Sequence, residues 1–403
     1  MRILDFTTIV LGPMATRMLG DHGADVIKIE GIAGDLTRTS GTVRNGGLSS
    51  LFLSMNRNKR SIAVDLKRPR GLDVARRLIA TADVMVHNIR VAAIERLGLG
   101  YAAASAINPR LVYCAATGFG QDGPDRDKPA FDDIMQAASG IAGLVAQQQG
   151  QPDFMPTLIA DKTAAMAVVN AVLAAIVHRE RTGQGQYVEV PMFETMVDFM
   201  LAEHMGGMSF EPQTGPAGYK RLMAGGRKLL PTSDGYLAAL PYTVMQWRAF
   251  FAAVGREDVL TSLGITTASH VNANTGHLYA AMAQITPLRS TAQWLELFER
   301  LDIASTALYS LDELPQHPHL QAVGLFRTEQ HPTQGTIQTI RPTTRFSGAP
   351  LKVTRLAPEL GQHSGELLAE LGYASDEIAD MVASGDAVAW PPAGGGTPEA
   401  PHV

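Results

Sequence analysis

The chain has 403 residues, which is too many for one ordinary core, so we expect a large domain and a smaller second unit. Its composition is that of a globular protein, and its net charge of -5 argues against general nucleic-acid binding, which requires a basic surface. The single cysteine, Cys114, excludes an intrachain disulfide and a cysteine-based zinc cluster.

The N-terminal sequence MRILDFTTIV lacks the apolar run and the small-residue cleavage site of a signal peptide. The longest apolar stretch, Ala164 to Val177, is interrupted by Asn170 and is too short to span a bilayer. We therefore expect a cytoplasmic protein without a membrane partner. The 11 histidines show no HExxH-type spacing, so the sequence predicts no metal site.

The first half of the chain alternates between short β-rich runs and helical patterns. Helices are predicted after the Gly-Pro pair at 12–13 and near residues 71–80 and 93–97. Parallel strands need helical crossovers of this length, so the pattern predicts a Rossmann-like α/β domain with a mostly parallel sheet. The predicted strands are ILDF, ADVIKIE, SIAVDLK, ADVMVHN and LVYCAATG.

A dinucleotide-binding unit would have a glycine-rich GxGxxG loop after its first strand, and this chain has none. Glu30, at the end of the second strand, stands where such a unit holds a ribose. Without the glycine loop this interpretation has little support.

From Asp161 to Thr182, apolar residues recur at three- and four-residue spacing. This predicts a long helix with Asp161 at its start and Gly183 just past its end. A strand, QYVEVPM, and another helix, FETMVDFMLAEHM, follow and complete a large domain predicted over residues 1–205.

The second half predicts a linker over residues 206–230, because that segment is rich in Gly, Pro, Lys and Arg. A smaller α+β domain is predicted over 231–326. Residues 327–384 carry a hairpin around Gly335 and two helices. The segment 385–403 has too little apolar content to pack and is predicted to be a disordered tail.

Several motifs occur together and in order, from residue 2 to about residue 384. As a set they resemble the class III CoA-transferase family, which includes the formyl-CoA and carnitine CoA-transferases and the related α-methylacyl-CoA racemases. The resemblance implies a large and a small domain joined by two long linkers, with residues 327–384 returning to the large domain. It also implies that two chains interlock as an intertwined homodimer. The motifs are LDFTTIVLGPMATRMLGDHGADVIKIE, GDLTR, NRNKRSIAVDLK, RLGLGY, NPRLVYCAATGFGQDGP, HRERTGQGQYVEVPMFE and LAPELGQHSGELLAELGY.

In the transferases of this family, an aspartate attacks the acyl-CoA donor and forms an enzyme-bound anhydride. CoA then returns to give an aspartyl-CoA thioester, from which the acceptor acid takes the CoA. Asp161, in PTLIADKTAA, matches this aspartate. A carboxylate at a helix N-terminus is held ionised by unpaired backbone N–H groups, which agrees with a nucleophile. The alternative is a plain N-cap aspartate.

The phosphates of CoA require fixed positive charge in the site. The basic residues that match CoA-binding positions of the family could instead be ordinary solvated side chains. The family's ENFRPG motif reads HNIRVA in this chain, so the chain departs from the family at the adenine end. The matching residues are Val10, Leu11, Arg38, Lys67, Asn88 and Arg96.

The racemases of the family use a histidine and an aspartate on opposite faces of the α-carbon. Their GHD motif reads Ala130, Phe131 and Asp132 here, and a phenylalanine cannot exchange protons. A racemase or related isomerase is therefore a disfavoured alternative, and Asp132 and Asp133 are expected to cap the helix that follows them. A second alternative is a non-catalytic CoA-binding paralogue, against which the retained aspartate argues.

A short glycine loop covers the reacting thioester in the transferases. Gly225 and Gly226 match its place, although a plain turn is a serious alternative. The sequence thus predicts an acyl-CoA:carboxylate CoA-transferase with no tightly bound cofactor. Its predicted substrates are an acyl-CoA donor, which brings the coenzyme A, and a carboxylic acid acceptor.

Overall fold

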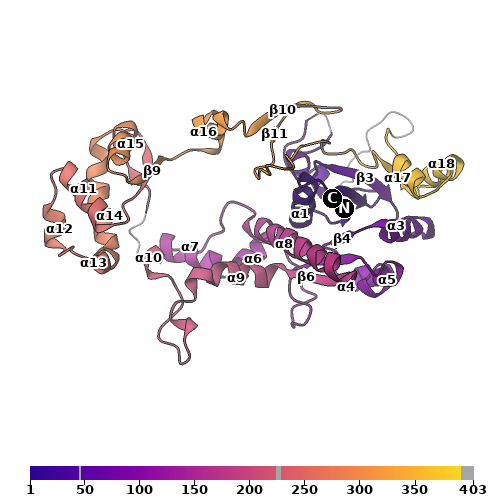
Figure 1. The fold of residues 1–403 in the computed structure, drawn as a ribbon, viewed down its shortest axis with the longest axis horizontal. Coiled ribbons are helices and arrows are strands. Elements are labelled where there is room, and N and C mark those ends of the chain that lie inside the picture. The colour runs from indigo at the N-terminus through magenta and orange to yellow at the C-terminus, as the bar shows by residue number, and fades with distance from the viewer. Residues whose placement is uncertain (45–46, 224–227, 392–403) are drawn as a thin grey trace. The chain divides into compact units, whose positions relative to one another are not determined.

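The structure is a computed structural model, and it describes residues 1–44, 47–223 and 228–391. The chain folds into two compact units (Figure 1). Among the described residues, the first unit contains residues 1–44, 47–143, 153–200 and 323–391, and the second contains residues 144–152, 201–223 and 228–322. The predicted linker and domain boundaries stay predictions.

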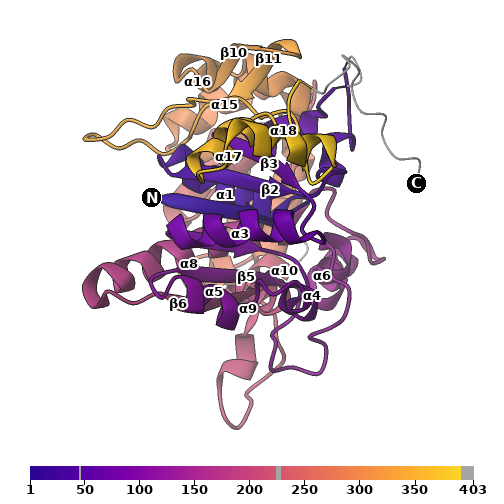
Figure 2. The same ribbon diagram turned by 90° about the vertical axis from the view of Figure 1, so that its right-hand side faces the viewer.

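The first unit is built on a seven-stranded sheet with the order β12-β3-β2-β1-β4-β5-β6 (Figure 2). Neighbouring strands pair in parallel except β12, which pairs antiparallel with β3. The order 3-2-1-4-5-6 is that of Rossmann folds, so the predicted α/β fold with a mostly parallel sheet is confirmed. The strands are β1 (Arg2–Phe6), β2 (Asp25–Glu30), β3 (Lys59–Val64), β4 (Val84–His87), β5 (Val112–Thr117), β6 (Gln186–Pro191) and β12 (Ala387–Val388).

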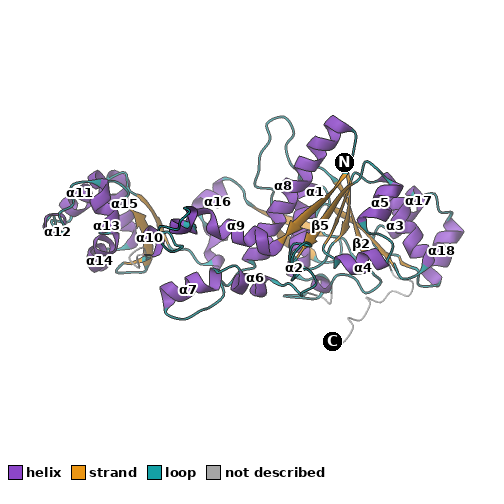
Figure 3. Ribbon diagram, turned by 90° about the horizontal axis from the view of Figure 1, so that it is seen from below, coloured by secondary structure: helices purple, strands orange, loops and turns teal. Residues whose placement is uncertain are grey.

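Helices cover both faces of this sheet (Figure 3). One face packs against α3, α5 and α17 through an apolar core that includes Leu4, Phe6 and Leu367. The opposite face packs against α1 and α8, and Asp5 points to it. The helices are α1 (Leu11–Asp21), α2 (Ser50–Met55), α3 (Pro69–Thr81), α4 (Val91–Arg96), α5 (Tyr101–Ile107), α6 (Asp132–Ala138), α8 (Ile159–Thr182), α17 (Ser364–Glu370) and α18 (Ser375–Ala383), with a 3-10 turn η1 (Leu36–Arg38).

The helix α8 is long and apolar enough, by length and composition alone, to cross a membrane. In the structure, 44% of its most apolar window is buried inside the protein. Its buried residues include Ala164, Val168 and Val172, which lie on the face that packs against the sheet.

The prediction of one helix after Asp132 and Asp133 is wrong. Gly140, with φ of 91°, separates α6 from a second helix, α7 (Ile141–Gln149). At the other end of the chain, β12 adds to the sheet edge within the segment predicted to be a tail, because Ala387 packs into the core of the first unit.

The predicted hairpin is confirmed: β10 (Phe326–His331) and β11 (Gly335–Ile340) pair antiparallel, with Gly335 at φ of 66°. The second unit has a three-stranded antiparallel sheet and a core of stacked aromatic side chains such as Trp247 and Trp294. The helix α9 (Met192–His204) leads from the first unit into the second. The second unit's elements are β7 (Leu230–Pro231), β8 (Tyr236–Leu240), β9 (Ala304–Ala307), α10 (Lys220–Met223), α11 (Val244–Ala253), α12 (Asp258–Ser262), α13 (Ala268–Ala273), α14 (Thr275–Ile285), α15 (Thr291–Arg300), α16 (Pro318–Ala322), η2 (Gly206–Ser209), η3 (Thr286–Leu288) and η4 (Leu311–Gln316).

Candidate active site

Asp161 lies in the first turn of α8, as the third residue of the helix. The N-cap position belongs to Leu158, whose side chain makes no capping bond. Within the described residues, the carboxyl group of Asp161 has no hydrogen-bond partner. The alternative interpretation of Asp161 as an N-cap residue is therefore wrong, and its carboxylate is available for chemistry.

The capping carboxylate comes from Asp132 at the start of α6, which is 5% exposed. Its Oδ2 accepts a hydrogen bond from the backbone N–H of Asp161 at 3.0 Å, and its Oδ1 accepts one from Nε2 of Gln136 at 2.7 Å. Gln136 also accepts from the N–H of Met155 at 2.8 Å. The prediction that Asp132 caps its own helix is wrong, since its carboxylate caps α8 and is tied by Gln136 to the preceding loop.

This arrangement sets the ionisation of Asp161. Burial raises the pKa of its carboxyl group, and the charge of Asp132 raises it further, to about 7. Burial and the like charge act against the helix N-terminus, which favours the ionised form, so the prediction that the N-terminus holds this carboxylate ionised stays a prediction. With a pKa near neutrality, the protonated and the ionised forms of Asp161 are both accessible around pH 7. A carboxylate that few hydrogen bonds stabilise is a strong nucleophile once ionised.

The carboxyl edge of the sheet brings Asp161 near the nucleotide-binding position of a Rossmann fold. The helices α1 and α8 both run opposite to the parallel strands, so both begin at the carboxyl edge. The strand order reverses between β1 and β4, and ligands of open α/β sheets bind at such a switch point. The fold and the sequence motifs therefore place the candidate site at the same edge of the sheet.

The residues Val10, Leu11 and Asn88 meet at this switch point. Val10 and Leu11 open α1 and are buried, at 1% and 5% exposed. Asn88 follows β4 and joins the turn before α1: its Oδ1 accepts from the N–H of Thr8 at 3.0 Å, and its Nδ2 donates to the Thr8 carbonyl at 2.9 Å. Asn88 thus has a structural role, and its contact with CoA stays a prediction.

Arg38 is buried rather than open to a ligand, at 7% exposed. Its Nε and Nη2 donate to the two carboxylate oxygens of Glu30 at 2.8 and 2.6 Å, and the guanidinium lies 4.0 Å from the centre of the Phe52 ring. Burial alone would raise the pKa of Glu30, but Arg38 outweighs it and the pKa falls to about 2. Glu30 therefore serves the fold, not a ribose, and phosphate binding by Arg38 stays a prediction.

Lys67 and Arg96 have exposed side chains, Lys67 after β3 and Arg96 at the end of α4. Neither forms an ion pair with another described residue. These two cations are available to a phosphate in the present conformation, whereas Arg38 is not fully available.

Two further predictions concern the glycine pair proposed to cover the thioester and the residue at position 131. Gly225 and Gly226 lie outside the described residues. Phe131 is the N-cap residue of α6 and is 64% exposed, so no proton-exchanging side chain stands at that position. This agrees with the expectation that the racemase chemistry of the family is missing here.

A cavity of about 990 Å³ lies beside the start of α8 within the first unit. Its wall includes Lys162 and Met166 of α8, residues of α1, and the hairpin β10–β11. Its lysine and arginine side chains are Arg17, Arg44, Arg57, Lys162 and Arg341. The carboxylate of Asp21 lines the cavity as well and pairs with Arg17 and Arg57.

Sequence reasoning missed Gln136 and the capping role of Asp132, and it assigned no part to Asp35. Asp132 and Asp161 are 29 residues apart, and no periodic pattern signals a contact across that separation. For Asp35, a signal was present: it is an acid in the loop that follows β2, where it can cap the next turn, η1.

The fold and the site together indicate a class of enzyme. The sheet is of the Rossmann type, with its switch point between β1 and β4, and the carboxyl group of Asp161 at the same edge has a pKa near neutrality. These features fit an enzyme that uses carboxylate chemistry on a nucleotide-containing substrate. The family follows from comparison. The chain belongs to CoA-transferase family III, whose model matches residues 1–364.

Two curated relatives illustrate the similarity. The chain is 31% identical over 390 residues to the succinyl-CoA:glutarate CoA-transferase of Mus musculus, covering 95% of this chain and 88% of that protein. It is 30% identical over 378 residues to the succinate–glutarate CoA-transferase of Agrobacterium fabrum, covering 92% and 94%. Among solved structures, a CAIB/BAIF family protein from Brucella suis matches with a TM-score of 0.80 at 28% identity, covering 92% of this chain and 98% of that one.

The predicted family and the predicted enzyme class are thus confirmed. The protein is a class III CoA-transferase, and its family acts on CoA thioesters and carboxylates.

Proposed function

We propose that this enzyme transfers CoA from an acyl-CoA to a carboxylic acid with Asp161 as the covalent carrier. The observation that carries the proposal is the state of the Asp161 carboxyl group. It is half-buried at the carboxyl edge of the sheet, has no hydrogen-bond partner among the described residues, and has a pKa of about 7.

In the first half-reaction, a carboxylate oxygen of Asp161 attacks the thioester carbonyl carbon, and the C–S bond breaks to release CoA thiolate. The product is a mixed anhydride between the acyl group and Asp161. The thiolate then attacks the Asp161 carbonyl of the anhydride, which releases the donor acid as a carboxylate and leaves an aspartyl-CoA thioester.

The second half-reaction repeats these steps in reverse order. The acceptor carboxylate attacks the aspartyl thioester and expels CoA thiolate, which then attacks the acceptor carbonyl of the new anhydride. Acyl-CoA leaves and Asp161 returns as a carboxylate. No water and no net proton enter the reaction, so a site that excludes water protects both intermediates from hydrolysis.

The CoA is proposed to lie along the switch point, against Val10, Leu11 and Asn88. Lys67 and Arg96, whose charges are unpaired among the described residues, face its phosphates, and Arg38 contributes through its remaining N–H groups. Gly225 and Gly226 are proposed to cover the thioester.

The first acids to test are dicarboxylates of four and five carbons. The names of the similar enzymes include succinyl-CoA and glutarate. The cavity beside α8 agrees with such an acid, because Lys162, Arg44 and Arg341 on its wall, which form no ion pair with a described residue, favour a second carboxylate.

We also propose a homodimer. The outer face of α8 exposes the apolar side chains of Met166, Leu173 and Val177 at helical spacing, and Phe131 and Ile134 of α6 are exposed as well. Exposed apolar surface of this extent is typical of an interface. Light scattering on the purified protein is expected to give twice the mass of one chain; a monomer at micromolar concentration would contradict the proposal.

The mechanism is tested by trapping the acyl group on Asp161. Wild type incubated with succinyl-CoA and then hydroxylamine is expected to carry a hydroxamate on the peptide containing Asp161, detected by mass spectrometry. Asp161→Ala is expected to lose both the label and transfer activity while it still binds CoA. Asp133→Ala, which removes an exposed acid nearby, is the matched control and should keep both. Substantial turnover by Asp161→Ala would refute the mechanism.

A further inference from the structure

The turn between β1 and α1 contains a residue in an unfavourable backbone conformation. Ile9 has φ of 72°, in the left-handed region, where a β-branched side chain is strained. Rossmann loops normally place glycine in this turn. The structure around Ile9 must therefore supply the free energy that holds this conformation.

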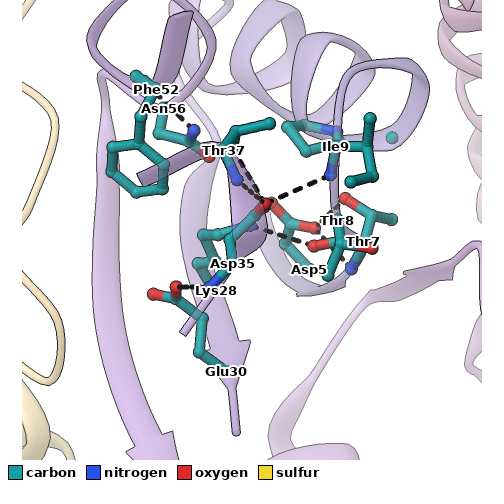
Figure 4. Close-up of polar contacts among 12 residues, drawn as sticks. Asp5, Thr7, Thr8, Ile9, Lys28, Glu30, Asp35, Thr37, Phe52 and Asn56 are labelled. Carbon is teal, nitrogen blue, oxygen red and sulfur yellow. Dashed lines mark hydrogen bonds and ion pairs between the residues drawn. The ribbon is translucent and has the colours of Figure 1, made fainter. Parts of the chain in front are cut away.

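The backbone N–H of Ile9 donates to Oδ1 of Asp35 at 3.3 Å (Figure 4). The other oxygen of Asp35, Oδ2, accepts from Nζ of Lys28 at 2.9 Å, and the same Nζ donates to the Thr7 carbonyl at 2.9 Å. Lys28 and Asp35 are 0% and 2% exposed. The buried Lys28–Asp35 ion pair thus forms hydrogen bonds to Thr7 and Ile9, the residues on either side of Thr8.

Lys28 is charged in this position. Burial lowers the pKa of its amino group, but the carboxylates of Asp5, Asp35 and Glu30 outweigh burial and raise it above its usual value. The charge keeps the carboxylate of Asp35 oriented, because rotation of Asp35 away from Ile9 would break the bond to Lys28.

The middle of the turn is held independently. Asn88 binds both the N–H and the carbonyl of Thr8, and Gly12 packs so closely that an added Cβ would stand 2.2 Å from the Thr7 side chain. With Thr8 clamped by Asn88, the orientation of the residues after it depends on the backbone angles of Ile9.

We propose that Asp35, oriented by Lys28, is a positioning residue for CoA: it holds Ile9 in the left-handed conformation and thereby sets the start of α1 against the coenzyme. The inference rests on the proposed function, because Val10 and Leu11 are placed there in the CoA path. The side chains of Asp35 and Lys28 thus hold a left-handed backbone conformation that a glycine provides in a Rossmann loop.

The test is a double-mutant cycle between positions 35 and 9, read by CoA affinity in titration calorimetry. Asp35→Asn is expected to weaken CoA binding about tenfold, since an amide beside Lys28 no longer holds the turn. Glycine adopts the left-handed conformation without strain, so the pair Asp35→Asn with Ile9→Gly should bind CoA within about threefold of Ile9→Gly alone.

Two matched controls separate positioning from general damage. Ile9→Val keeps the β-branch and should not rescue Asp35→Asn. Thr37→Val removes a different hydrogen bond to the same carboxylate oxygen, 2.8 Å long, and should leave CoA affinity within about twofold of wild type. If Asp35→Asn does not fold, Asp35→Glu keeps the charge beside Lys28, displaces the oxygen from Ile9, and must show the same rescue by Ile9→Gly.

The outcomes distinguish this inference from the proposed function. Thermal unfolding of the same four proteins without CoA measures the coupling of positions 35 and 9 directly. Wild-type binding of CoA together with additive losses in the double variant would overturn the inference and leave the proposed function intact. Coupling in unfolding, with no CoA binding by wild type, would refute the proposed function and with it the coenzyme role of the turn.

Discussion

Removing the charge of Asp132 is expected to shift the pH dependence of CoA transfer to lower pH. Asp161 must be ionised to attack, so kcat/KM for acyl-CoA should rise with pH through about 7 and then level off. Asp132→Asn removes the like charge and keeps an oxygen that can accept from the N–H of Asp161, so α8 stays capped.

The size of the shift follows from the causes of the raised pKa. Asp161 has a pKa of about 7, against 3.8 for an unperturbed aspartate, and burial is the larger of its two causes. Asp132 therefore accounts for less than half of the difference, and we expect Asp132→Asn to lower the midpoint by about 1 pH unit. At pH 5.5 the ionised fraction, and with it kcat/KM, should exceed that of wild type about five- to tenfold.

The assay is the initial rate of acyl-CoA consumption at subsaturating concentration, from pH 5 to 9, with a fixed acid acceptor. Asp133→Asn removes the same charge from an exposed neighbour and should leave the midpoint unchanged. A midpoint that stays near 7 in Asp132→Asn, or that rises, would refute the assigned electrostatics. A wild-type profile that is flat over this range would refute the raised pKa itself.

Four further results are expected. Because folding raises the pKa of Asp161, its ionisation opposes folding above pH 7 and not below the unfolded pKa of 3.8; Asp161→Asn should stabilise the protein by up to about 4 kcal/mol at pH 8, with no gain near pH 3.5 in thermal unfolding. Arg38→Ala leaves Glu30 buried without its partner and should cost about 3–5 kcal/mol of unfolding free energy in urea titration. Arg96→Ala should cost under about 0.5 kcal/mol of stability and weaken CoA binding about ten- to a hundredfold by calorimetry, with reduced discrimination against dephospho-CoA if Arg96 binds the 3'-phosphate. With Phe131 in place of a histidine, deuterium from solvent should not enter the α-carbon of a 2-methylacyl-CoA at a rate comparable with transfer.

Most of the fold could be predicted because its elements carry local patterns. The strand β5 is a continuous apolar run that is buried on both faces, and α8 has an apolar residue at nearly every turn. Elements that depend on distant partners were missed. The two-residue strand β12 exists only because β3 offers an edge. The break between α6 and α7 was missed for a different reason, because it depends on a local left-handed turn at Gly140.

In the candidate site, too, local features were predicted and features that depend on distant residues were not. The position of Asp161 at the start of a helix is local, and the sequence predicted it. Its ionisation is not local, because it depends on burial and on a carboxylate 29 residues away. The motif around Arg38 marked an important residue, but no spacing reveals that its guanidinium lies inside the unit against Glu30.

The buried charges beneath the β1–α1 turn are better explained by positioning than by stability. Buried ion pairs contribute little net stability, because desolvation offsets most of their attraction. The side chains of Lys28, Asp35, Lys59 and Asp5 are nevertheless 0% exposed and joined in pairs on one face of the sheet. Lys28 and Asp35 hold opposite sides of the turn, and Lys59 donates both to Asp5 and to the Pro13 carbonyl in the first turn of α1.

A glycine loop would need no such network, since glycine adopts left-handed angles without strain. A glycine would also leave the turn free to sample other conformations before CoA arrives, and CoA binding would have to order it. When an isoleucine is held by fixed charges, the turn is already ordered in the folded protein, and CoA binding does not have to order it. Breaking either buried pair leaves a charge without its partner and costs unfolding free energy. The feature expected to distinguish the network from the Arg38–Glu30 pair is the coupling of position 35 to the backbone conformation of Ile9.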